Sequence, residues 1–245
     1  MAIPASLANQ LSLPVIGSPL FIISNPDLVI AQCQSGIIGS FPSLNARPIE
    51  QLDEWLTRIN EELAAARAAD PKAKIAPYAV NLIVHKSNTR IEEDLALCVK
   101  HKVPIIITSL GARPEVNDAI HSYGGIVLHD IINIVFAHKA LEKGADGLIA
   151  VCAGAGGHAG TLSPFALISE IREFFDGPLA LSGSMSTGRQ ILAAQAMGAD
   201  FAYMGTAFIA TDEARAVDAY KDMIVASAAK DIVYSSLFTG VSGNY

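Results

Sequence analysis

Short apolar runs alternate with amphipathic segments from one end of the chain to the other. The runs are nearly continuous in apolar residues and are bounded by Gly, Pro, Asn and Asp, which is typical of buried parallel strands. Eight strands are predicted, over residues 15–20, 36–41, 75–82, 104–109, 126–129, 147–152, 179–182 and 201–205. The amphipathic segments predict a helix after each strand, over residues 26–34, 49–69, 91–102, 114–123, 132–143, 164–175, 188–197 and 213–229.

Eight strand-helix pairs predict a (β/α)8 barrel, the TIM barrel, rather than an open doubly wound sheet, although both show this alternation. At 245 residues with 51% hydrophobic residues, the chain is long enough for one barrel domain over residues 1–245. Two helix ends read alike, Lys143-Gly144-Ala145-Asp146 and Met197-Gly198-Ala199-Asp200. This similarity has two possible explanations: the two halves of the barrel are an internal repeat, or loops between a helix and a strand converge on the same sequence.

Reactive residues of such barrels lie at the carboxyl ends of the strands. That rule selects Ser18, Pro19, Phe41, Pro42, Asn81, Ser109, His129, Asp130, the loop 154–158, Gly183, Ser184, Gly205 and Thr206.

The most distinctive of these segments is Ala153-Gly154-Ala155-Gly156-Gly157-His158-Ala159-Gly160, which follows the sixth predicted strand. Its glycines let the backbone approach a bound molecule closely. A histidine held there is a candidate for reaction or ligand binding, and His158 is our candidate catalytic residue.

Small residues also end the seventh and eighth strands, at Gly183-Ser184 and Gly205-Thr206. Barrels often hold a phosphate at this place, with backbone N–H groups and a following helix N-terminus as donors and a Ser or Thr hydroxyl as a further donor. These loops predict a phosphate-bearing ligand, with plain turn glycines as the alternative.

Two further strand ends have two readings each. His129 and Asp130 could both reach a ring system at the barrel mouth, or Asp130 could cap the next helix with His129 incidental. The amide of Asn81 can donate to and accept from a heterocycle edge, or could serve a structural turn.

Other classes of ligand have little support. No G-x-G-x-x-G follows the first strand and no P-loop motif occurs, so a mononucleotide flavin suits the chain better than NAD. Metal-ligand spacings are absent, and the formal charge of -7 argues against nucleic acid. The lack of a long apolar run argues against a membrane span, and three cysteines without C-x-x-C spacing indicate a reducing, cytoplasmic setting.

The chain resembles the flavin-dependent nitronate monooxygenases, formerly called 2-nitropropane dioxygenases, over nearly all of its length. The most specific parts are Ala155-Gly156-Gly157-His158, Ser182-Gly183 with Gly188-Arg189, and Met197-Gly198-Ala199-Asp200 leading into Met204-Gly205-Thr206. The FMN-dependent enoyl-acyl-carrier-protein reductases share the fold and much of this pattern, so the resemblance is firmer for FMN than for the reaction.

The resemblance implies that His158 is a catalytic base and that FMN is the cofactor. It implies that Asn81, Gly156, Gly183, Tyr203, Met204, Gly205 and Thr206 contact FMN, and that Pro19 and Leu20 belong to the strand-one segment beneath the flavin. The predicted cofactor-binding set also includes the strand-end and loop residues His129, Asp130, Gly157 and Ser184.

Several positions depart from the family pattern. Members usually have Gln at Val151 and Glu at Gly154, and many have Gly at Ser184. Asp130 stands where a Lys or Gln often lies near the flavin's pyrimidine edge. Members also continue past the position of Tyr245 into a helical region, so we expect a C-terminal extension to be missing here.

Three functions follow as hypotheses. The first is FMN-dependent oxidation of alkyl nitronates or nitroalkanes with O2. The second is NAD(P)H-dependent reduction of enoyl thioesters or quinones through FMN, and the third is a flavin-binding barrel without catalysis. Each implies a small-molecule ligand, and a homo-oligomer is left open.

Overall fold

A computed structural model describes residues 5–158, 160–238, 240 and 242–245, with the side chains of Ala5, Ser6 and His158 outside the described part. Within it, eight parallel strands form a barrel: β1 (Val15–Gly17), β2 (Gly39–Pro42), β3 (Tyr78–Ile83), β4 (Ile105–Ser109), β5 (Ile126–Ile131), β6 (Gly147–Val151), β8 (Leu179–Ser182) and β9 (Phe201–Met204). The hydrogen-bonded order is β1-β9-β8-β6-β5-β4-β3-β2. A bridge between Ile16 and Ile38 joins β1 to the residue before β2 and closes the ring. The predicted (β/α)8 barrel is confirmed.

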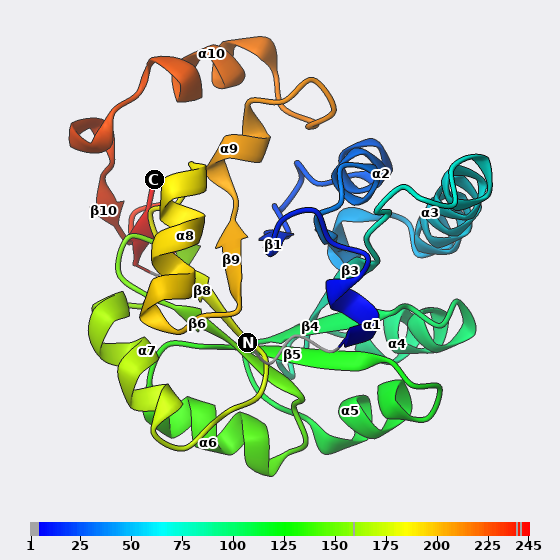
Figure 1. Cartoon of the computed structure of the whole chain (residues 1–245), viewed down its shortest axis with the longest axis horizontal. Coiled ribbons are helices and arrows are strands. Elements are labelled where there is room, and N and C mark those ends of the chain that lie inside the picture. Colours follow the sequence, from blue (N-terminus) through cyan, green and yellow to red (C-terminus); the bar gives the residue numbers. More distant parts are fainter. Residues whose placement is uncertain (1–4, 159, 239, 241) are drawn as a thin grey trace.

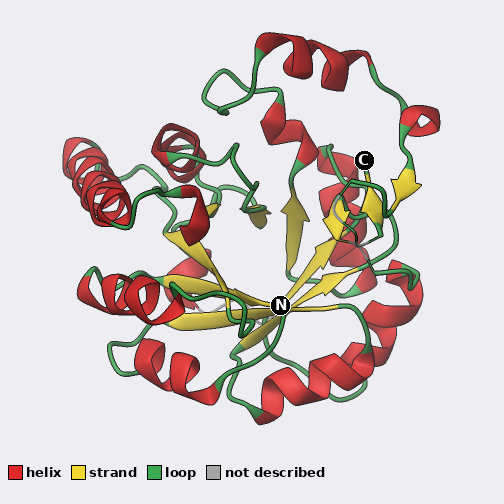
Figure 2. Ribbon diagram, turned by 180° about the vertical axis from the view of Figure 1, so that it is seen from behind, coloured by secondary structure: helices red, strands yellow, loops and turns green. Residues whose placement is uncertain are grey.

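Helices surround the strands in both views (Figures 1 and 2). They are α2 (Pro26–Gln34), α3 (Glu50–Ala69), α4 (Ile91–Lys100), α5 (Pro114–His121), α6 (Ile134–Glu142), α7 (Pro164–Arg172) and α8 (Gly188–Met197). The short helix α1 (Ala5–Ala8) precedes β1, and a 3-10 turn at Ser43–Asn45 follows β2. In the described part of the chain, no helix is both long and apolar enough to cross a bilayer.

The strands are apolar on both faces because each face packs against a different layer. Alternate residues such as Ile105, Ile107 and Ile149 pack inside the barrel, together with Leu7 and Leu11 from the N-terminal segment. The residues between them, such as Ile106 and Val127 on one side and Leu148 on the other, pack outward against the helices. A side chain's parity along its strand therefore decides whether it faces the barrel interior or the helices.

The two glycine-alanine-aspartate segments make the same turn. Gly144 and Gly198 both have positive φ, 91° and 108°, as a left-handed residue ending a helix does. Asp146 then accepts the N–H of Val127 at 2.7 Å, and Asp200 accepts the N–H of Leu179 at 3.0 Å. Each carboxylate thus binds the start of the preceding barrel strand, which is a common structural reason for the echo in the sequence.

The C-terminal segment departs most from the predicted pattern. Instead of one helix over residues 213–229, the structure has α9 (Thr206–Ile209), α10 (Asp218–Ala226), a 3-10 turn at Ala229–Asp231 and a small hairpin of β10 (Tyr234–Ser235) and β11 (Gly243–Asn244). Residues 211–217 do not start the helix because the Arg215 N–H bonds to the Ile23 carbonyl and Asn25 donates to the Glu213 carbonyl. These bonds hold the segment against the loop after β1 rather than in a helix.

Candidate functional site

A chain of polar groups lies inside the barrel near the carboxyl ends of β3, β4 and β5. Asn81 shares the inward parity of Ala79, Ser109 that of Ile107, and Asp130 that of Leu128. The Asn81 amide donates to the Ile107 carbonyl at 3.0 Å and to the Ser109 hydroxyl at 2.8 Å. The Ser109 side chain and the Leu110 N–H in turn lie near the Asp130 carboxylate and favour its charged form. The three side chains therefore form one connected network under the barrel mouth.

Burial governs the charge of this network. Desolvation raises the pKa of Asp130 from 3.8 to about 6, although the bonds from Ser109 and Leu110 favour its charged form. Desolvation and the charge of Asp130 also raise the pKa of Tyr203 well above its ordinary value, which keeps this phenol neutral. The network therefore holds one carboxyl that exchanges its proton near neutral pH beside a group that stays protonated.

Replacement of Asp130 by Asn is expected to change how stability depends on pH. The folded pKa, about 6, lies above the unfolded value of about 3.9, so this group favours the folded state fully below pH 4. That contribution is lost as pH rises through about 6. Relative to the wild type, Asp130→Asn should therefore gain about 1–3 kcal/mol of stability between pH 4 and pH 8, measured by urea unfolding.

The neighbouring variant Ser109→Ala is the control for this assignment. Loss of its hydroxyl removes a bond to the charged carboxylate, so the pKa of Asp130 should rise further and the transition should move to higher pH. Parallel pH profiles for wild type and Asp130→Asn would contradict the role given to burial.

The structure separates His129 from Asp130. Since β5 continues to Ile131, His129 takes the outward parity of Val127, and its Nδ1 lies 2.6 Å from the Thr108 hydroxyl in the layer between strands and helices. Burial lowers the pKa of this imidazole to about 4. His129 therefore does not join the other candidate residues at the mouth.

The alternative readings of Asp130 and Asn81 are also decided. The cap of α6 is Asn133, whose side chain accepts the Phe136 N–H at 3.0 Å, so Asp130 does not cap this helix. Asn81 lies within β3, paired with Ile107 of β4, and is not a turn residue.

The glycine loop after β6 leads into β7 (Gly157–His158) and is exposed at Gly156 and Gly157. A methyl group built at either glycine would meet no described residue within 4 Å, which leaves space beside this backbone. The C-terminal hairpin borders this loop, because Gly156 bridges Asn244 and the Asn244 amide donates to the Ala155 carbonyl at 2.7 Å. No pattern in the sequence indicates this contact. The backbone of His158 lies in this bordered loop.

Ser184 and Gly154 join the loop after β8 to the loop after β6. Ser184 has φ 50°, in the left-handed region, and its N–H and hydroxyl lie 3.0 Å and 3.2 Å from the Gly154 carbonyl. A methyl group at Gly154 would lie 2.1 Å from the Ser184 hydroxyl oxygen. Gly154 and Ser184, two positions that depart from the family pattern, are therefore in contact. The Ser184 hydroxyl points toward Gly154.

This pair predicts a non-additive double-mutant cycle. Gly154→Ala is expected to cost about 2 kcal/mol, because position 154 has φ 85° and the methyl group would meet Ser184. Ser184→Gly should change stability by less than about 1 kcal/mol, since relief of the left-handed conformation offsets one weak hydrogen bond. In the double variant only the strain at position 154 remains, so coupling of about 1 kcal/mol should appear in urea unfolding. Additive effects would contradict the contact.

The end of β9 meets the loop after β1. The Ser18 N–H donates to the Met204 carbonyl at 2.7 Å, and a methyl group at Gly205 would lie 3.3 Å from the Leu20 side chain. The Met204 side chain itself packs outward with Ala202. Among the predicted flavin-binding residues of β1 and β9, the mouth is reached by the backbone of residues 204–206 and by the loop that carries Pro19 and Leu20. Tyr203 instead packs inside the barrel with Phe201.

The structure thus brings most of the predicted residues to one end of the barrel. The strand-end rule selects Ser109 but assigns it no chemical role. In the structure Ser109 links Asn81 to Asp130. Because Ile105, Ile106 and Ile107 are all apolar and buried, no local sequence signal shows which face of β4 points inward, and this role could not be found from the sequence.

Comparison with known proteins places this geometry in context. The family model "Nitronate monooxygenase" matches residues 7–243. The chain is 25% identical over 228 residues to a "(3aS,4S,5R,7aS)-5-hydroxy-7a-methyl-1-oxo-octahydro-1H-indene-4-carboxyl-CoA dehydrogenase" of Rhodococcus jostii, over 93% of this chain. It is 23% identical over 268 residues to a probable nitronate monooxygenase of Staphylococcus aureus, over 96% of this chain and 76% of that protein.

A solved structure of nitroalkane oxidase from Streptomyces ansochromogenes has the same fold. Its TM-score is 0.84 at 22% identity, over 98% of this chain and 78% of that chain. The chain spans only 61% of the length of the Rhodococcus relative. With a family model matched from residue 7 to residue 243, the chain belongs to the nitronate monooxygenase family.

Proposed function

We propose that this chain is an FMN-dependent oxidoreductase that oxidises alkyl nitronates, or nitroalkanes after deprotonation, with O2. The observation that carries the proposal is the network of Asn81, Ser109 and Asp130 inside the mouth, beside loops whose glycines leave open space. Family membership supports the reaction class.

The residues present fit a mononucleotide flavin. A pyrimidine edge alternates N–H and C=O groups. Asn81, whose two amide hydrogens are donated within the protein, offers its amide oxygen to such an edge, and Asp130 offers a titratable carboxyl. The phosphate would lie at the ends of β8 and β9, near Gly183, Gly205 and Thr206, close to the start of the ten-residue helix α8. A methyl group at Gly188, where α8 begins, would meet none of the described residues within 4 Å, so that backbone can accommodate a ligand.

The rim of the mouth suits a substrate with an alkyl part. Large apolar side chains in the loops after β1, β4 and β5 stay exposed, among them Phe21 at 57%, Leu110 at 56% and Ile132 at 42%. Exposed apolar groups gathered at the end of a barrel are typical of a binding site.

The proposed roles of the residues follow from their chemistry. Bound FMN would accept electrons from the substrate and pass them to O2. Asn81 and Asp130 would orient the ring edge, with Ser109 holding the carboxyl in place. His158 would take the α-proton of a neutral nitroalkane, as suits an imidazole with an ordinary pKa of about 6.5.

The visible spectrum of the purified protein, followed by aerobic assays, tests the proposal. Flavin bands near about 370 and 450 nm, with FMN released on denaturation, are expected. Turnover of a preformed propyl-2-nitronate with O2 consumption would support the reaction. A colourless protein that cannot be reconstituted with FMN would refute the cofactor and the reaction together.

A second candidate is an NAD(P)H-dependent reductase that acts on an enoyl thioester or a quinone through FMN. The relative in Rhodococcus jostii supports it, because its name describes a dehydrogenase of a carboxyl-CoA compound. Anaerobic mixing with NADH or NADPH separates the candidates. Rapid bleaching of the flavin would favour the reductase, and no bleaching would favour the nitronate reaction.

A further inference from the structure

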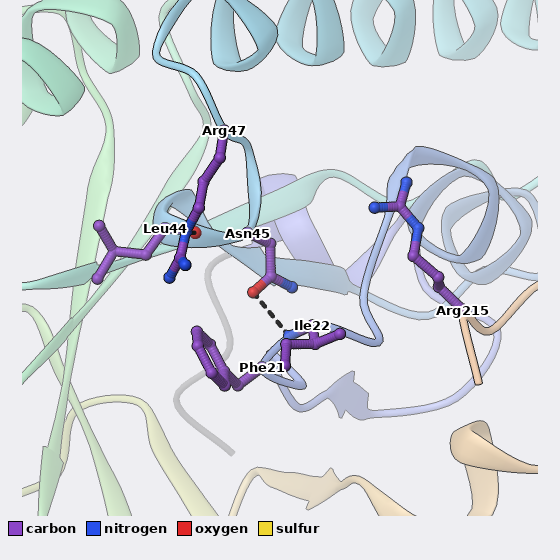
Figure 3. A pocket seen from close by; sticks show the side chains of 6 residues that line it. All are labelled: Phe21, Ile22, Leu44, Asn45, Arg47 and Arg215. Atoms are coloured by element: carbon purple, nitrogen blue, oxygen red, sulfur yellow. Dashed lines mark hydrogen bonds between the residues drawn. The ribbon is translucent and has the colours of Figure 1, made fainter. Parts of the chain in front are cut away.

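A small pocket of about 100 Å³ lies on the seam of the barrel where β9, β1 and β2 meet. Its lining comes from the loop after β1, the loop after β2 and the segment after α9. The lining residues are Phe21, Ile22, Leu44, Asn45, Arg47 and Arg215 (Figure 3). All three segments follow the carboxyl ends of strands, so the pocket lies at the same end of the barrel as the polar network.

Two guanidinium groups in this pocket have no carboxylate partner within the described part of the chain. Arg47 donates its Nε to the Leu44 carbonyl at 2.8 Å and lies over the Phe21 ring, while Arg215 lies over the Trp55 ring. Among the described residues, neither joins an ion pair, and none of the six lining residues is acidic. A chain with net charge -7 has ample carboxylates to pair these cations. Both arginines are exposed, so their remaining N–H donors are open to an anion from outside the chain.

The scaffold that presents these cations is fixed by hydrogen bonds. Asn45 accepts the Ile22 N–H at 2.8 Å and donates to the carbonyls of Leu20 and Ser24, both at 2.9 Å. Ile22 has φ 68°, a strained conformation for a β-branched residue that these bonds hold in place. Figure 3 shows Arg47 and Arg215 on either side of this Ile22–Asn45 bond.

Arg215 is fixed in the same way from the other side. The backbone N–H of Arg215 donates to the Ile23 carbonyl at 3.1 Å. This bond joins the segment after α9 to the loop after β1. The loops that carry the two arginines are thus joined to the loop after β1, and each guanidinium group lies over an aromatic ring.

We propose that Arg47 and Arg215 form an anion subsite that binds a phosphate or carboxylate group of a small-molecule substrate. The exposed faces of Phe21 and Ile22 contact the apolar part next to that group. This inference rests on the proposed function in taking the barrel mouth as the reaction site, and it adds that the substrate carries an anionic group away from the reacting carbon. A simple nitroalkane has no such group, so the subsite favours a larger, acidic substrate.

Direct binding to the flavin-loaded protein tests the subsite without turnover. Pyrophosphate, hexanoate and coenzyme A are titrated by calorimetry, and the fluorescence of Trp55 is followed, since this is the chain's single tryptophan and lies under Arg215. Binding of pyrophosphate or coenzyme A would identify a phosphate ligand, and binding of hexanoate alone a carboxylate ligand. Either result supports the subsite. Absence of binding of all three at millimolar concentration would overturn it.

Charge-removing variants give the second test. Arg47→Gln and Arg215→Gln should each weaken binding about tenfold to a hundredfold, because each removes charge-assisted hydrogen bonds. The matched control is Arg113→Gln, which removes an arginine near the end of β4 that Glu92 and Glu115 already pair. This control should bind like wild type. Equal binding by all three variants would overturn the proposal.

The outcomes remain separable from those of the proposed function. Anion binding by a protein that holds no flavin would refute FMN chemistry and leave the subsite standing. A flavoprotein that turns over nitronate but binds none of the probes would refute the subsite alone.

Discussion

Asp200→Ala is expected to lower the free energy of unfolding by about 3–5 kcal/mol, because it removes one partner of a buried ion pair. The Asp200 side chain is 2% exposed and lies 2.7 Å from Nη2 of Arg172. It also accepts the Leu179 N–H, which would lose this bond at the start of β8. The remaining partners of Arg172 are the carbonyls of Gly198, Phe175 and Gly177, which carry no compensating charge. For a chain of this size the melting temperature should fall by about 10 °C.

The second copy of the same turn supplies the matched control. Asp146 makes the equivalent bond to the Val127 N–H, but its side chain is 41% exposed and its partner is His121. Asp146→Ala should therefore cost only about 1 kcal/mol. Asp200→Asn can keep an acceptor for the Leu179 N–H but loses the charge, so it should fall between these two variants. Equal losses at Asp146 and Asp200 would show that the turn, rather than the buried charge, sets the stability.

The barrel could be predicted because its strands and helices have local signals. The apolar runs end at Gly, Pro and Asp, and the bounds of α2 and α8 match the predicted ranges. The C-terminal segment could not be predicted in the same way. The pattern of residues 213–229 predicts one amphipathic helix. In the structure the Asn25 amide donates to the Glu213 carbonyl, and the backbone N–H of Arg215 donates to the Ile23 carbonyl, so the first part of this segment is not helical. Those partners are nearly 190 positions away along the chain.

The site was predictable as a set of strand ends but not in its finer geometry. His129 and Asp130 are adjacent in sequence, and a strand sends adjacent side chains to opposite faces. Because both faces of β5 are buried, apolar residues around them gave no sign of which one points inward. The Gly154–Ser184 contact was hidden for another reason, since it joins two loops that are 30 residues apart.

His158→Asn is expected to abolish most turnover of neutral nitroalkanes while leaving nitronate turnover nearly intact. A nitroalkane must lose its α-proton before it can give up electrons, and a positioned general base contributes about 10²- to 10⁴-fold to such a step. A preformed nitronate has already lost that proton. The predicted result is a fall of this size in kcat/KM for 2-nitropropane, with the value for its nitronate within about threefold of wild type.

The control is His85→Asn, which changes an exposed histidine in the loop after β3 and should alter neither reaction. FMN content should stay equal in all three proteins, since the flavin contacts proposed above do not involve the His158 imidazole. The pH profile gives a further readout. Nitroalkane turnover by wild type should rise with pH as the imidazole loses its proton, and this rise should vanish in His158→Asn. Equal losses on nitroalkane and nitronate would exclude a role as base and point instead to substrate positioning by this glycine-rich loop.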